Sequence, residues 1–128
     1  MITGIHHLSM KCDSAEDFAR TKDFYCRVLG FSVVREWPEG IMLETGRGQL
    51  EIFCNGPGIR TKGAIRHVAF ACDDVDGIAA RVKAEGYRVF IEPNDITVPS
   101  VPEFHARMAF CIGPLGEEIE FFQEITFS

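Results

Sequence analysis

Apolar residues follow two different periods along this chain, and the succession of periods occurs twice. At 5–12 and 65–72, short apolar runs are bounded by polar residues, as in strands. At 13–31 and 73–90, apolar residues recur every three or four positions, after a residue that can cap a helix and before a glycine that can end one. Each half therefore begins with a predicted strand and a predicted helix.

Three further strands are predicted after each helix. They cover Ser32–Trp37, Gly40–Thr45 and Gln49–Asn55 in the first half, and Arg88–Glu92, Ala106–Ile112 and Glu118–Glu124 in the second. The halves differ most at residues 92–106, which hold three prolines. We expect a long loop there, and loops of that length are often functional.

The two halves also share a motif. HHLSMKCD at 6–13 returns as RHVAFACD at 66–73, so that His7 recurs as His67, 60 residues later. A repeat of this period indicates two copies of one structural unit. The order of elements, strand, helix and three strands in each half, predicts an α+β fold.

The repeat also predicts the domain organisation. We expect one domain over residues 1–128, made of a module at 1–56 and a module at 64–128. The turn-rich segment NGPGIRTKG at 55–63 is the Gly- and Pro-containing linker between them.

The bulk composition is that of a soluble globular protein, with 46% hydrophobic and 25% charged residues and a formal net charge of −6. Lys and Arg are scattered, so we expect neither nucleic acid nor a membrane as partner. No apolar run approaches the roughly 20 residues that cross a bilayer, and the N-terminus does not look like a signal peptide. Five cysteines without a CxxC pair indicate reduced thiols and predict a cytoplasmic location.

Strand alternation places one histidine and one glutamate of each half on the same side of its sheet. The bulkier apolar residues of 5–12 must face the helix, so His7 faces away from it, and His67 does so in the second half. In the stretches LEIF and IEFF, Glu51 and Glu120 also stand on the face away from the helix. If the halves pair by pseudo-two-fold symmetry, these four side chains can converge.

Two imidazoles and two carboxylates form a suitable donor set for a divalent metal. Imidazole nitrogen suits nickel, zinc, cobalt and iron, and carboxylate oxygen also suits manganese and magnesium. A single histidine or glutamate on a strand more often has a structural or solvated role, so spacing alone leaves both interpretations open. One carboxylate beside the ion could instead serve as a general base.

The chain resembles the vicinal-oxygen-chelate superfamily, the group of glyoxalases, bleomycin-resistance proteins and dioxygenases. The resemblance rests on GIHHLSMKCD, DFYCRVLGF, LEIF, IRHVAF and GPLGEEIEFF and covers essentially the whole chain. It implies two βαββ modules that form a curved mixed sheet cup, with one divalent metal per site (nickel, zinc, cobalt or manganese). By position, the implied ligands are His7, Glu51, His67 and Glu120.

Within this group, two branches with four ligands are the most similar, glyoxalase I (lactoylglutathione lyase) and methylmalonyl-CoA epimerase, because Glu51 stands where three-ligand branches have no ligand. Of these two, the carboxylate favours the glyoxalase I branch, since the epimerase is similar to this set with Gln at that position. The resemblance implies a lyase or isomerase that abstracts a proton next to a metal-chelated carbonyl through an enediolate. Glu120 is the expected base, with Glu51 second. The alternatives are a metal-independent drug-binding protein, a thiol transferase and an acyl-CoA epimerase.

The resemblance also implies substrate contacts. Lys11 and Asn55 fall where similar glyoxalase I enzymes contact glutathione with an Arg and an Asn, although a lysine lacks the bidentate fork of arginine. The aromatic residues expected around the substrate are Phe53, Phe122 and Phe104, with Trp37 as a further candidate. His105 is either a further acid or base or a solvated loop residue. The expected partners are a small molecule with vicinal oxygens and, in a homodimer, a second copy of the chain.

Overall fold

Two compact units make up the chain, Met1–Thr61 and Lys62–Ser128. The structure, a computed structural model, describes residues 1, 3, 5–58, 60, 61 and 63–125. The boundary between the units falls inside the linker that the sequence predicts. The last three residues of the predicted second module lie outside the described residues.

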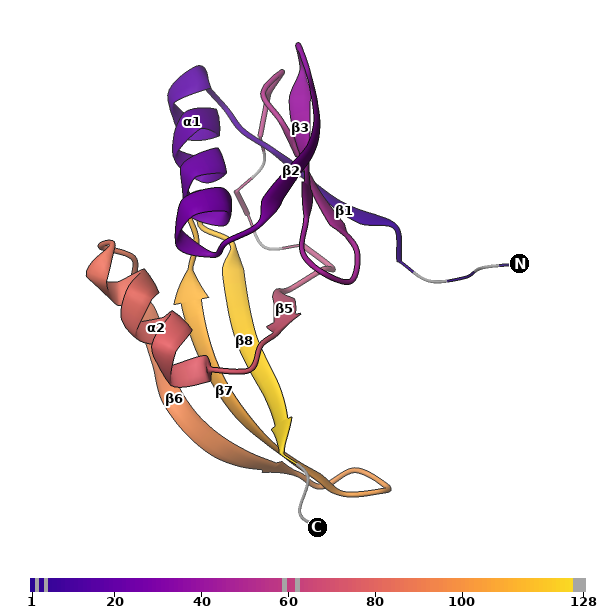
Figure 1. Cartoon of the computed structure of the whole chain (residues 1–128), viewed down its shortest axis with the longest axis vertical. Helices are drawn as coiled ribbons and strands as arrows, with labels where there is room; N and C mark the ends of the chain where they lie inside the picture. The colour runs from indigo at the N-terminus through magenta and orange to yellow at the C-terminus, as the bar shows by residue number, and fades with distance from the viewer. Residues whose placement is uncertain (2, 4, 59, 62, 126–128) are drawn as a thin grey trace. The chain divides into compact units, whose positions relative to one another are not determined.

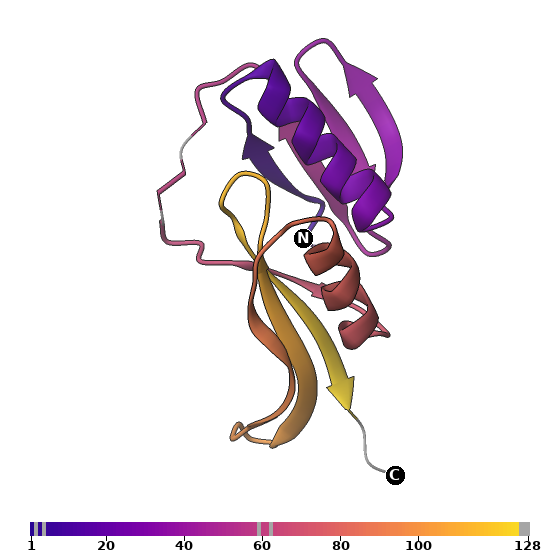
Figure 2. The same ribbon diagram turned by 90° about the vertical axis from the view of Figure 1, so that its left-hand side faces the viewer.

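The first unit is a four-stranded mixed sheet with one long helical segment. Its elements are β1 (His7–Lys11), α1 (Ala15–Asp23), the π-helix η1 (Phe24–Val28), β2 (Ser32–Trp37), β3 (Gly40–Glu44) and β4 (Gln49–Phe53). The strand order is β1-β4-β3-β2, with β1 parallel to β4 and the other neighbours antiparallel. The helix lies along one face of the sheet (Figure 1; Figure 2).

The second unit repeats this order of elements. It consists of β5 (Val68–Ala71), α2 (Val75–Ala84), β6 (Val89–Val98), β7 (Phe104–Ile112) and β8 (Glu118–Ile125). The strand order is β5-β8-β7-β6, again with only the first pair parallel. The predicted α+β fold of two repeated modules is confirmed.

The helices begin and end where the sequence predicts. Ser14 caps α1 and Asp74 caps α2, each accepting a hydrogen bond from the backbone N–H three residues later, at 3.1 and 2.9 Å. Gly30 and Gly86 follow the helical segments with φ of 84° and 90°, a conformation that favours glycine. Within the described residues, no helix is long and apolar enough to cross a membrane.

The first helical segment ends in a π-turn that the sequence does not predict. The N–H of Leu29 donates to the carbonyl of Phe24 at 3.0 Å, five residues back. This wider turn brings two successive aromatic residues, Phe24 and Tyr25, into the core, where both are fully buried. A spacing of three or four residues does not predict that two successive residues are both buried.

Each sheet buries the face that its helix covers. In β4, Leu50 and Ile52 are buried, while Glu51 between them lies on the other face. In β8, Ile119 and Phe121 are buried on the helix side in the same way. The alternation that the sequence predicts for these two strands is therefore the one that the fold uses.

The predicted loop at 92–106 is wrong. Strands β6 and β7 extend through most of it as a long hairpin, and only residues 99–103 connect them (Figure 1). Pro93 is tolerated because β6 is an edge strand, and because the register shifts between Ile91 and Asn94, where Pro93 has no ladder partner. The prediction failed because, in the sequence, a proline at an irregular position of an edge strand cannot be distinguished from a proline in a loop.

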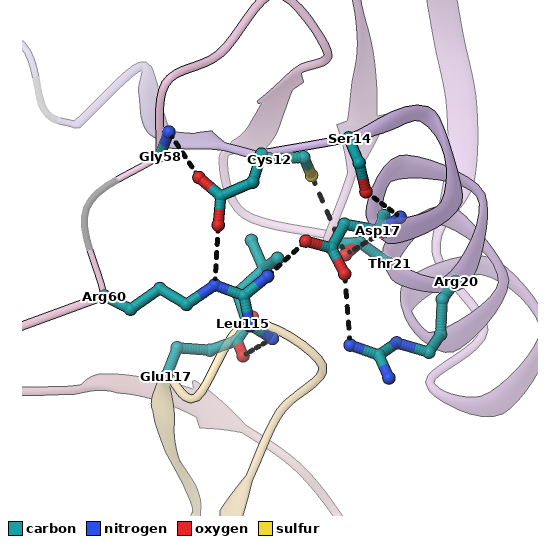
Figure 3. A network of polar contacts seen from close by, with 10 residues as sticks. Cys12, Ser14, Asp17, Arg20, Thr21, Gly58, Arg60, Leu115 and Glu117 are labelled. Carbon is teal, nitrogen blue, oxygen red and sulfur yellow. Dashed lines mark hydrogen bonds and ion pairs between the residues drawn. The ribbon is translucent and has the colours of Figure 1, made fainter.

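Polar contacts hold the linker to the start of α1 (Figure 3). The N–H of Gly58 donates to Asp13 Oδ1 at 2.7 Å, and Arg60 Nε donates to Asp13 Oδ2 at 3.0 Å. Arg60 also bonds to the carboxylate of Asp17, which receives a second arginine, Arg20, at 3.3 Å. The chain therefore leaves the first unit along a defined path.

Candidate functional site

In the first unit, the register of β1 and β4 brings a histidine and a glutamate together. His7 is the partner of Gln49, and Glu51 is two residues further along on the same face. The two side chains are diagonal neighbours, with His7 Nε2 3.6 Å from Glu51 Oε1. The His7 side chain is 38% exposed and the Glu51 side chain 14%. The imidazole of the pair is therefore accessible to solvent, while the carboxylate is mostly buried.

The second unit builds the same pair. Ala69 in β5 is the partner of Glu120 in β8, and His67 stands two residues before Ala69. His67 Nε2 lies 3.4 Å from Glu120 Oε1, with side-chain exposures of 40% and 11%. The 60-residue repeat thus reproduces the same arrangement of side chains in both units.

The two carboxylates have different surroundings. Glu120 is buried, with 8% of the residue exposed, and its cross-strand partner in β7 is Phe110, whose ring packs edge-on against His67. Burial raises the pKa of Glu120 above its ordinary value of 4.5, and His67 opposes this shift. The corresponding cross-strand partner of Glu51 is the flexible Met42.

The spacing of the donor atoms in each pair suits two ligands of one metal ion. An ion with bonds of about 2.1 Å keeps two ligand atoms about 3.0 Å apart at right angles and about 3.4 Å apart in tetrahedral geometry. The nitrogen–oxygen separations of 3.4 and 3.6 Å are close to the second value. Within either unit, the described part of the chain gathers no cluster of three or more possible ligands. One unit therefore supplies two donors, fewer than the three or four protein ligands of ordinary sites.

The predicted substrate residues of the first unit lie along the same strands as its pair. Lys11 ends β1, is exposed, and has Phe53 as its partner in β4. Phe53 is half-buried and packs edge-on against Trp37 with ring centres 5.9 Å apart. Asn55 follows β4 and is exposed. Lys11 and Phe53 share the sheet face of Glu51, whereas Asn55 lies beyond the strand.

The predicted aromatic residues of the second unit also meet. Phe122 is two residues after Glu120 in β8, on the same face. Phe104 lies at the start of β7, and its ring is 6.3 Å from that of Phe122 in an edge-on arrangement. Each unit therefore carries an aromatic pair beside its histidine–glutamate pair.

His105 does not join the glutamate of its unit. Its register partner in β8 is Ile125, which puts it on the opposite face from Glu120. There His105 Nδ1 lies 3.0 Å from Thr97 Oγ1, and its Nε2 lies 3.6 Å from Glu103. The expected loop position of His105 is wrong, because His105 lies in β7, on the face of the sheet opposite Glu120.

Sequence reasoning missed two residues next to the pairs. His6 Nδ1 lies 2.9 Å from His7 Nδ1, and Phe110 packs against His67. The dipeptide His6-His7 was a visible signal for the first contact. Phe110 is identified only by the register of β7 against β8, which the sequence does not contain.

Known proteins are similar to this chain over nearly its whole length. A family model described as the Glyoxalase/Bleomycin resistance protein/Dioxygenase superfamily matches residues 4–121. The uncharacterised protein YaeR of Escherichia coli strain K12 is 28% identical, over 94% of this chain and 95% of YaeR.

Two solved structures show how widely the fold is used. Lactoylglutathione lyase from Agrobacterium tumefaciens superposes with a TM-score of 0.70 at 20% identity, over 96% of this chain and 95% of that one. TnmS3, an antibiotic binding protein from Streptomyces sp. CB03234, gives a TM-score of 0.72 at 23% identity, over 97% and 98%. With the family match over nearly its whole length, the chain belongs to the Glyoxalase/Bleomycin resistance protein/Dioxygenase superfamily.

Proposed function

We propose that this protein is a metal-dependent lyase or isomerase of the glyoxalase I type, which moves a proton at a carbon next to a carbonyl. The observation that carries the proposal is the recurrence of one diagonal histidine–glutamate pair, with donor atoms 3.6 and 3.4 Å apart, in both units. His7, Glu51, His67 and Glu120 together would hold one divalent ion, nickel, zinc, cobalt or manganese. The pairs of one site come from one chain or from the two chains of a homodimer.

The bound ion would polarise the substrate carbonyl and stabilise the negative charge that develops on neighbouring oxygens. The work of the protein is to move the proton. Glu120 is our candidate base, since it is the more buried carboxylate and its neighbour Phe110 keeps water away from one side. Glu120 would take the proton from one carbon and return the same proton to the adjacent carbon. Glu51 is the second candidate for this base.

A small molecule with vicinal oxygens would bind on the sheet faces that carry Glu51 and Glu120, the faces away from the helices. The aromatic pairs Trp37–Phe53 and Phe104–Phe122 offer apolar surface beside the carboxylates. Lys11 is an exposed cation two residues beyond Ser9 on the face of His7, where it would attract an acidic group of the substrate. A glutathione-like or other acidic carrier fits this charge, and the cytoplasm is the compartment that we propose.

Metal content tests the proposal. We expect about one nickel, cobalt, zinc or manganese ion per site in protein purified without chelators or a metal-binding tag, measured by elemental analysis. His7→Ala should lose the metal, whereas His105→Ala should keep it, because His105 lies on the other face of its sheet. If the wild type holds no metal and takes none up on titration, the mechanism is refuted and a ligand-binding role is favoured.

Glu51→Gln separates this proposal from thiol transfer with three ligands. The four-ligand site should lose most of its metal affinity or turnover when the carboxylate becomes an amide, since the amide carries no charge. A three-ligand site should change little. Hemithioacetals and acyl-CoA epimers are the first substrates to assay in the metal-loaded protein.

A further inference from the structure

The glutamate of the first unit has polar neighbours on one side of its strand. Glu51 is paired with Ser9 in β1, and the next position on the same face of β1 is the exposed Lys11. On the other side, in β3, Glu51 is paired with Met42, and the next position on that face is Gly40, which has no side chain. The first unit therefore offers a hydroxyl and a cation beside its carboxylate.

In the second unit, the residues at the same four positions are all apolar. Glu120 is paired with Ala69 in β5, and the next position on the same face of β5 is Ala71. In β7, Glu120 is paired with Phe110, and the next position on that face is Met108. From Glu120 toward the end of β8, the face away from α2 is therefore flanked by apolar side chains on both sides.

Aromatic rings meet at Phe110, beside the carboxylate. The Phe110 ring packs edge-on against His67 with ring centres 5.2 Å apart, and its centre is 5.5 Å from that of Phe90 in β6. Phe122 follows Glu120 by two residues on the same face. All three phenylalanines are only half-buried. The rings around Phe110 thus hold one another in place and still present apolar surface to a ligand.

Two alanines leave room beside these rings. Ala69 and Ala71 are exposed and carry only a methyl group, whereas their register partners in β8, Glu120 and Phe122, have long side chains. A flat group bound beside Glu120 can therefore lie over the alanines and against the rings. Aromatic groups favour such contacts, with ring centres about 4.5–7 Å apart. A methyl group in the same place would leave most of this apolar surface in water.

We propose that this face of the second unit selects substrates that carry a flat apolar substituent, such as a phenyl group, on the carbon next to the reacting one. The inference rests on the proposed function, because it names the substrate class of that reaction. Phe110 is the residue that determines this specificity, since it stands directly opposite Glu120. Burial of the added apolar surface should favour phenyl over methyl by about tenfold or more.

Two chelators that differ in one substituent test the proposal. Benzohydroxamate and acetohydroxamate both offer two neighbouring oxygens to a metal, and they carry a phenyl and a methyl group on the carbonyl carbon. Calorimetric titration of the zinc-loaded protein should show binding of benzohydroxamate that is about tenfold tighter or more. The hemithioacetals of phenylglyoxal and methylglyoxal should differ in kcat/KM in the same direction.

Two variants assign the preference to this face. Phe110→Leu removes the ring, and Ala71→Leu fills the space beside Phe122 at an exposed position, where the fold should tolerate it. Each should lower the preference for benzohydroxamate at least about threefold, with little change in the binding of acetohydroxamate. Met42→Leu is the matched control and should keep the wild-type ratio, because Met42 is paired with Glu51 as Phe110 is with its own glutamate.

Methyl NMR of the metal-free protein gives a result that does not depend on zinc. At millimolar concentration, benzohydroxamate should shift the methyl signals of Ala69 and Ala71 through the ring current of its phenyl group. Acetohydroxamate has no ring and should leave these signals in place.

Equal affinities of the two chelators for the zinc-loaded protein would overturn the inference and leave the proposed function intact. An unchanged ratio in both Phe110→Leu and Ala71→Leu would do the same. If the protein binds no zinc, the proposed function fails. The alanine signals then still decide whether this face binds the phenyl group, and unshifted signals would overturn the inference.

Discussion

Replacing Gly40 by alanine should disturb the strand that carries Glu51. Gly40 begins β3 opposite Phe53, and a Cβ there would lie 2.7 Å from the carbonyl oxygen of Ile52 in β4. It would also lie 3.1 Å from the ring of Trp37 and 3.3 Å from that of Phe53. The two rings close over the glycine because it has no side chain.

The size of the effect follows from these distances. Ordinary contacts begin near 3.4 Å, so β3 and β4 must separate locally by about 0.7 Å to admit the methyl group. The nearest atom belongs to the backbone, which cannot rotate away, and overpacking of this kind costs about 1–3 kcal/mol. With a urea dependence of about 1–3 kcal/mol per molar, a cost of about 2 kcal/mol lowers the unfolding midpoint by about 1 M.

The chain contains a single tryptophan, Trp37, so its fluorescence reports unfolding at this position. We expect Gly40→Ala to unfold at a lower urea concentration than the wild type. The emission maximum of Trp37 in the folded variant should also be shifted. Gly63→Ala is the matched control, because a Cβ at Gly63 meets no atom within 4 Å, and its free energy of unfolding should stay within about 0.5 kcal/mol of the wild-type value. An unchanged midpoint and spectrum for Gly40→Ala would refute the close packing of Trp37 and Phe53 over the glycine.

Three further predictions concern other parts of the chain. Burial raises the pKa of the Cys111 thiol to about 12, so Cys111 should resist Ellman's reagent at pH 8 until the protein is unfolded, which mass spectrometry of the labelled peptides can check. A hydrogen bond from Arg107 lowers the pKa of Asp76 below its ordinary value of 3.8. The stability that the ionised Asp76 contributes is present above pH 3.8 and is lost as the pH falls through the lowered pKa. In an acid titration, the stability of Asp76→Asn should therefore fall less steeply below about pH 4 than that of the wild type. Asp13→Ala removes one of the two carboxylates that hold Arg60 and the acceptor of the Gly58 N–H, so trypsin should cut after Arg60 several times faster than in the wild type. An equal rate would show that the Asp13 contacts do not restrain the linker.

Much of the fold could be predicted because its signals are local. The caps at Ser14 and Asp74 and the stops at Gly30 and Gly86 depend on residues within one turn. The extra residue of the π-turn and the hairpin through Pro93 were missed, because both depend on tertiary packing. A proline that sits in a register shift of an edge strand has the same sequence as a proline in a loop.

For the candidate site too, the part that depends on local sequence could be predicted and the part that depends on tertiary structure could not. Alternation predicts that Glu51 and Glu120 lie on the open faces, and the parallel registers then make each a diagonal neighbour of its histidine. Alternation assigns a residue to a face of its own sheet and carries no information on how two sheets are placed against each other. The four-ligand set therefore stays a prediction, to be decided by metal content.

The repetition of one diagonal pair bears on how such a protein could arise. A histidine and a glutamate are too few ligands for an ordinary site, whereas two copies of one module about a two-fold axis would supply four. An ancestral chain of half this length would have needed self-association to capture an ion, and a gene duplication with fusion would have removed that dependence on concentration. Fusion would also allow the halves to diverge. His6 precedes one imidazole and Arg66 the other, a difference that a symmetric dimer of one short gene product cannot carry.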